Sequence, residues 1–187
     1  MVGPLVPPSI QIIVASASTI DRVMMNRIVK TVKVIGNKIS KEQLSQLQEM
    51  MKAHPTLVSL CGIADDATEA NLSGLGMDAD DAVVLADELP AKRALAAVNI
   101  LNNDIGAEQA QNFVAILKEH ATLKSLCGNK GDETELDMSG KKLHAEGAIM
   151  LAPEIVANGA LTSLDLPNHT IPTDEHTNLS RISESKT

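Results

Sequence analysis

Four groups of carboxylate residues are spaced closely enough to share a proton or a metal ion. They are Asp65 and Asp66; Asp78, Asp80 and Asp81; Asp132 and Glu133; and Glu135 and Asp137. General acid–base catalysis needs two carboxyl groups in contrasting environments, one of them partly buried. These groups fall instead in expected loops, first helical turns and exposed strand positions, and none has the Asp-x-Asp-x-Asp-Gly spacing of a calcium loop. The sequence therefore predicts a protein that is not an enzyme, with no metal site and no cofactor.

The five histidines do not form a recognisable ligand set. They are His54, His120, His144, His169 and His176. His54 and His120 occupy equivalent places at the expected ends of two helices, where the helix dipole stabilises a positively charged imidazole. His169 and His176, close to Glu175, could bind a stray metal ion, but no further ligand converges there.

The two cysteines, Cys61 and Cys127, share the local sequence Ser-Leu-Cys-Gly and are far apart in the chain. We expect buried, unpaired thiols rather than a disulfide or a redox pair. Unpaired thiols fit a reducing compartment and predict a cytoplasmic location. The apolar residues 10–14 lack the preceding basic residues of a secretory signal, and no apolar run is long enough to span a membrane.

An internal repeat must position most of these residues. The pattern L-x-x-L-x-L-x-x-N-x-L runs over residues 95–105 and recurs, in some places weakly, from positions 29, 67, 133 and 161. The spacings alternate between a longer and a shorter one, because residues 57–66 and 123–132 are insertions of about ten residues. One long and one short unit together therefore form a larger repeat, with a first copy at 54–105 and a second copy at 120–171.

Each repeat start is followed by helical apolar spacing. Ser40 and Gln43 have the spacing of a capping box, and a helix is expected from there to about residue 53. Further helices are expected over 77–89, 106–117 and 145–156. A strand followed by a returning helix, repeated in register, predicts parallel strands with the helices on the opposite side.

These strand-plus-helix units resemble the ribonuclease-inhibitor-like subclass of leucine-rich repeat proteins, from residue 29 to about residue 171. The resemblance implies an α/β leucine-rich-repeat solenoid, with a curved parallel β-sheet on the concave side and α-helices on the convex side. It also implies protein binding, and backbone contacts by Asn37 and Asn103 at the turns. The insertions depart from the family pattern, and we expect them to form protruding loops or short hairpins.

The domain boundaries follow from the repeat. Residues 1–28 would form an irregular N-terminal cap or lead, residues 29–171 a domain of about five repeats, and residues 172–187 a polar tail. The tail offers no strong apolar cap, so the C-terminal end of the repeats is a possible surface for self-association.

Charge and composition narrow the choice of partner. The net charge is −8, yet the first 53 residues are basic, so the remainder is strongly acidic. An acidic body disfavours phosphate backbones and anionic membranes, and the single aromatic residue, Phe113, disfavours base stacking. The sequence thus predicts a basic protein partner, no nucleic acid and no membrane, although acidity that serves only solubility is equally consistent.

Partner-binding residues are predicted at outward strand positions between the motif leucines. They are Glu69, Asn71, Asn99, Glu135, Asp137 and Asp165. We expect a non-catalytic protein-interaction scaffold that uses these residues as an acidic concave face, with an ordinary solvated strand face as the other interpretation. The resemblance leaves open a regulatory module of the GTPase-activating, actin-capping or immune-sensor type, or a fragment of a larger receptor.

Overall fold

The computed structural model describes residues 28–166. The expectations for the N-terminal lead, the polar tail, the last residues of the repeat domain and self-association at its C-terminal end lie outside these residues. So do His169, Glu175 and His176.

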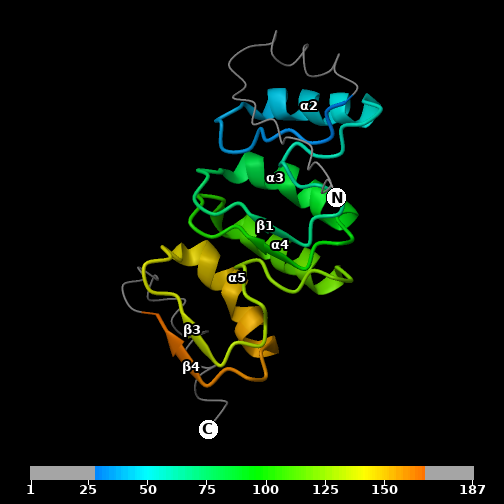
Figure 1. The fold of residues 1–187 in the computed structure, drawn as a ribbon. Coiled ribbons are helices and arrows are strands. Elements are labelled where there is room, and N and C mark those ends of the chain that lie inside the picture. The colour runs from blue at the N-terminus through cyan, green and yellow to red at the C-terminus, as the bar shows by residue number, and fades with distance from the viewer. Residues whose placement is uncertain (1–27, 167–187) are drawn as a thin grey trace, which may run out of the picture.

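Helices and short strands alternate along the described chain. The elements are α2 (Lys41–Ala53), β1 (Glu69–Asn71), α3 (Ala79–Glu88), the 3-10 helix η1 (Leu89–Ala91), β2 (Ala97–Asn99), α4 (Gly106–Glu119), β3 (Glu135–Asp137), α5 (His144–Ala157) and β4 (Ser163–Asp165). Each helix packs against the next in chain order, so α2, α3, α4 and α5 follow one another along the molecule (Figure 1). No helix between residues 28 and 166 is long and apolar enough to cross a membrane.

Local sequence rules account for the helix starts. The predicted capping box at α2 is confirmed, because Ser40 and Gln43 each bind the other residue's backbone N–H. A second capping box opens α3, where the Asp78 carboxylate accepts from the Asp80 and Asp81 N–H groups. The acidic residues at this position are therefore helix-capping groups, as expected from their place in the first turn.

The core is a continuous aliphatic layer between helices and strands. Leu85, Leu95 and Leu126 are fully buried, and Phe113 is buried among them. The turn asparagines bind backbone as the resemblance implied: Asn37 Nδ2 donates to the Val34 carbonyl at 2.8 Å, and Asn103 Nδ2 donates to the Leu72 carbonyl at 2.9 Å. The second contact joins neighbouring repeats.

The prediction of a leucine-rich-repeat solenoid with one curved parallel sheet is wrong. Within residues 28–166 the strands form two separate parallel pairs, β1 with β2 and β3 with β4. The described part is therefore a small α/β domain with two short sheets, and no continuous concave sheet lines one of its sides.

The sheet is divided because both hydrogen-bonding edges of β2 are already occupied. A strand has two hydrogen-bonding edges, and β2 uses one for β1. Its other edge meets the second insertion: the Val98 N–H donates to the Ser125 carbonyl at 2.9 Å, and the Ile100 N–H donates to the Leu126 carbonyl at 3.0 Å. No edge of β2 remains for β3, which pairs with β4 instead.

The insertions are part of the core, so the expectation of protruding loops or hairpins is also wrong. Leu57, Leu60 and Ile63 are buried, and the first insertion lies beside residues 30–34 as the second lies beside residues 96–100. The glycine that ends each Ser-Leu-Cys-Gly sequence allows this close approach. Gly128 has φ +79°, and a Cβ there would lie 3.0 Å from the Asn99 Cβ.

Replacing Leu60 with Ala tests whether the insertion is core. Leu60 is 1% exposed. We expect Leu60→Ala to lower the free energy of unfolding by about 2–5 kcal/mol, because it removes buried methyl groups and leaves a cavity. Val58, two residues earlier and 37% exposed, is the matched control, and Val58→Ala should cost far less. Equal and small effects in urea unfolding would mean that the insertion is a surface loop.

Candidate functional site

The six predicted partner-binding residues lie on two separate faces. Glu69 and Asn71 are exposed on β1, beside the half-buried Asn99 on β2. Glu135 and Asp137 are exposed on β3, beside the exposed Asp165 on β4. The outward orientation predicted from strand alternation is found, but the single continuous row is not, because the sheet is divided.

Three of these side chains bind backbone groups two residues along the chain. Asn71 Oδ1 accepts from the Ser73 N–H at 3.1 Å, Asn99 Oδ1 accepts from the Leu101 N–H at 3.2 Å, and Asp137 Oδ1 accepts from the Ser139 N–H at 2.7 Å. Hydrogen bonds from the Ser139 hydroxyl and backbone N–H lower the pKa of Asp137. These contacts fix the orientation of the side chains and keep Asp137 ionised.

The β3–β4 face carries the stronger negative charge. The register places Asp137 directly beside Asp165, and Glu135 beside Ser163. Like charges opposite each other on neighbouring strands repel. Between residues 28 and 166 the ion pairs are Lys52 with Glu49 and Lys92 with Asp65, so neither carboxylate of this pair has a cation within 4.0 Å there.

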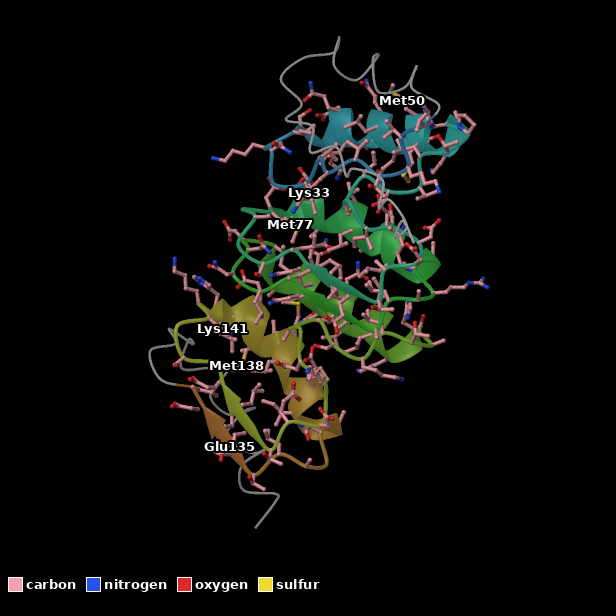
Figure 2. The ribbon with its side chains drawn as sticks, in the orientation of Figure 1. Lys33, Met50, Met77, Glu135, Met138 and Lys141 are labelled. Carbon is pink, nitrogen blue, oxygen red and sulfur yellow. The ribbon has the colours of Figure 1, made fainter. Side chains whose placement is uncertain are left out.

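The basic end of the described chain is remote from this face. Figure 2 shows Lys33 near α2 and α3, toward one end of the molecule, and Glu135 on β3, toward the other. Lys33 therefore does not contribute to the surface formed by Glu135, Asp137 and Asp165. Lys141 is nearer, and its charge contributes to lowering the pKa of Asp137.

Each insertion is anchored by a buried serine–glutamate contact that the sequence analysis did not identify. Ser59 Oγ donates to Glu88 Oε2 at 2.7 Å, and the Leu60 N–H donates to Glu88 Oε1 at 2.6 Å. In the second copy, Ser125 Oγ donates to Glu154 Oε2 at 2.8 Å. Both pairs are 29 residues apart and identical in the two copies. The presence of the same serine and glutamate at the same spacing in both copies was the sequence signal that could have revealed these contacts.

Burial shapes the chemistry of these clusters. Burial raises the pKa of Glu88 and of Glu154, although hydrogen bonds from the adjacent insertion oppose the shift. Burial next to these carboxylates also raises the pKa of Cys61 and Cys127 well above the usual value. The predicted free, buried thiols are confirmed, and protonated thiols without access to solvent are poor nucleophiles.

The two copies differ beside these clusters. Lys92 of the first copy is buried and lies near Glu88, whereas the equivalent position of the second copy is Asn158. A cavity of about 210 Å³ lies beside Asn158 and Glu154. Asn129 of the second copy, which replaces Ile63, donates to Glu154 Oε2 at 2.9 Å. The second cluster thus has an amide where the first has an isoleucine, no lysine beside its glutamate, and a cavity next to it.

His54 and His120 lie directly after the ends of α2 and α4, at the helix ends where the repeat places them. The Nδ1 atom of His54 accepts from the Leu57 N–H at 2.9 Å, and that of His120 accepts from the Leu123 N–H at 3.0 Å. His54 and His120 join each helix end to the start of the following insertion.

The remaining carboxylate groups have local structural contacts. Asp81 Oδ2 accepts from the Gly36 N–H at 2.9 Å. This contact joins α3 to the turn before α2. Glu133 accepts from the Lys130 and Gly131 N–H groups at 2.6 and 2.9 Å. Burial raises the pKa of Glu133, but these backbone hydrogen bonds outweigh it and the pKa is lowered. In the part of the chain that the structure describes, no three His, Cys, Asp or Glu residues are grouped as metal ligands.

Comparisons with known proteins give little further information. No family model matches the chain, and no curated protein matches it. Among solved structures, it is similar to a chain described as the actin-binding site 2 of leiomodin-1, with 16% sequence identity, 90% of each chain covered and a TM-score of 0.37. A TM-score this low does not establish a common fold.

A pH series can detect the buried carboxylate of Glu154. Because the folded state raises the pKa of Glu154 above its usual value of 4.5, the folded state binds the proton more tightly than the unfolded state. This group therefore favours folding most at low pH, and its contribution declines as the pH rises from about 4.5 through the raised value. Glu154→Gln removes this dependence and disrupts accepted hydrogen bonds, at a cost of about 1–3 kcal/mol.

The measurement is urea unfolding of wild type and Glu154→Gln between pH 4 and pH 8. The stability difference between them should be largest in acid and should shrink as the pH rises. Glu146→Gln, on the same helix, controls for the loss of one carboxylate. A stability difference that grows with pH would mean that the fold stabilises the ionised form of Glu154.

Proposed function

We propose that this protein is a non-catalytic protein-binding scaffold whose contact surface is the β3–β4 face. The observation that carries the proposal is the side-by-side placement of the exposed Asp137 and Asp165, with Glu135 on the same face. A segment of basic residues laid across β3 and β4 would neutralise three neighbouring negative charges that repel one another.

The distribution of charge supports this face over the β1–β2 face. The β1–β2 face offers one carboxylate, Glu69, together with the amides of Asn71 and Asn99. Both amides already accept hydrogen bonds from nearby backbone. We therefore assign partner binding first to the β3–β4 face, with the β1–β2 face contributing polar contacts at most.

The contacts of the buried ionisable groups support a non-catalytic role. Glu154 accepts hydrogen bonds from Leu126, Cys127, Ser125 and Asn129, so its oxygens are occupied by structural donors. A general base must have a free lone pair within reach of a substrate. Glu88 likewise accepts hydrogen bonds from Ser59 and Leu60 of the first insertion.

Charge reversal on β3 tests the proposal. We expect wild-type protein, immobilised and exposed to a cell extract, to retain one or more basic proteins. Glu135→Lys/Asp137→Lys should reduce retention by about tenfold or more, because attraction becomes repulsion at the centre of the face. The thermal midpoint should change little, since both side chains are exposed.

A second double variant, with the same net charge as Glu135→Lys/Asp137→Lys, distinguishes binding by the β3–β4 face from binding by overall negative charge. Glu108→Lys/Glu119→Lys reverses two exposed carboxylates on α4 and should retain the basic protein as wild type does. Equal retention by all three proteins would exclude the β3–β4 face. Equal loss in both double variants would mean that net charge alone causes retention.

A further inference from the structure

The first copy of the repeat contains a lysine side chain enclosed by the fold. Lys92 is 1% exposed, and its Nζ donates to the Val58 carbonyl at 3.0 Å and to Asp65 Oδ1 at 2.7 Å. Its positive charge also acts on Glu88, where it opposes the effect of burial. An ammonium group taken out of water needs such acceptors and a counter-charge.

The second copy has neither the lysine nor its ion-pair partner, because Asn158 stands in place of Lys92 and Gly131 in place of Asp65. The equivalent of Lys92 there is Asn158, whose Nδ2 donates to the Glu133 carbonyl at 3.0 Å and whose Oδ1 accepts from the Ala160 N–H at 2.9 Å. The asparagine thus joins the end of α5 to the segment before β3, and a cavity of about 210 Å³ is left beside it.

The cavity occupies the place that corresponds to the space around Lys92, but its acidic lining differs. Lys124, Gly131 and Glu154 line it, and they are the second-copy equivalents of Val58, Asp65 and Glu88. In the first copy, Lys92 contacts Val58 and Asp65, and its charge acts on Glu88. The first copy therefore serves as an internal template for the position of an ammonium group, but Gly131 carries no carboxylate and the counter-charge would come from Glu133 and Glu154.

The walls of the cavity suit an alkyl chain that ends in a cation. Leu136, Ile155 and Leu161 provide an apolar lining, while Glu133 and Glu154 provide two carboxylates. Lys124 and Lys130 also line it, but both residues are exposed. Two carboxylates disfavour an anion inside, and the volume is below that of an ordinary small-molecule pocket, so it suits a single side chain.

We propose that the cavity between the second insertion and the C-terminal end of α5 binds a primary alkylammonium group, as presented by a lysine side chain of a protein partner or by a free amine. The ammonium would take the place that Lys92 Nζ has in the first copy, near the Lys124 carbonyl. This site is distinct from the β3–β4 face and does not require Glu135, Asp137 or Asp165.

Two chemical probes and an uncharged analogue test the binding by NMR titration of the full chain. We expect n-butylammonium and Nα-acetyl-lysine methylamide to cause saturable shifts of the backbone amides of Asn129, Glu133 and Asn158. n-Butanol, which has the same alkyl length without the charge, should cause none. No saturable shift with either ammonium probe, or the same shift with n-butanol, would overturn the proposal.

A variant whose own side chain fills the cavity is the matched control. Asn158→Lys places the residue of the first copy in the second, and we expect it to weaken probe binding by about tenfold or more because the cavity is occupied. The reciprocal variant, Lys92→Asn, should open the first cavity and raise the number of bound probes from one to two. Unchanged binding by Asn158→Lys would overturn the proposal, and Lys92→Asn provides the second readout if Asn158→Lys does not fold.

Two further comparisons identify the source of the amine and separate the two sites. Tighter binding of a lysine-containing pentapeptide than of n-butylammonium would identify a protein partner, and the reverse order would identify a free amine. Both orders support the alkylammonium site. The Glu135→Lys/Asp137→Lys protein should keep the probe shifts, so failure of the strand face and failure of the cavity are distinguishable.

Discussion

The structure depends on two buried carboxylates, one in α3 and one in α5. Glu88 and Glu154 accept hydrogen bonds from a serine hydroxyl and from backbone N–H groups of the insertion that precedes each helix. Without these acceptors, several backbone donors would be buried without partners, and each such loss costs about 1–3 kcal/mol. The carboxylates therefore allow a polar backbone segment to lie inside the molecule, where it takes a strand edge and divides the sheet.

Features set by neighbours in the chain were predictable, and features set by distant contacts were not. The Ser40 capping box, the helix positions and the buried thiols follow from local spacing and repetition. The divided sheet depends on which segment reaches the free edge of β2, and the length of the insertion pointed to a loop instead. The burial of Glu88 and Glu154 also escaped prediction, because glutamate is almost always exposed unless specific donors surround it.

The candidate sites also have features that local sequence predicts and features that depend on distant contacts. Strand alternation correctly placed Glu135, Asp137 and Asp165 outward, since side chains of a strand alternate between its faces. The grouping of six residues into one surface required a continuous sheet and therefore failed. The cavity beside Asn158 could not be found from a motif, because it arises where a long side chain of one copy is replaced by a short one. Aligning the two copies against the structure makes that difference visible.

The 29-residue separation between each anchoring serine and its glutamate has a consequence for how such a chain can change in length. The serine belongs to the insertion of a long unit and the glutamate to the helix of the following short unit, so deletion of one short unit would remove the acceptor that the insertion needs. Duplication or deletion of a whole long-plus-short block keeps every serine with its own glutamate. The pair of units is thus the smallest block that can be added or removed without leaving either a buried carboxylate without donors or buried donors without an acceptor.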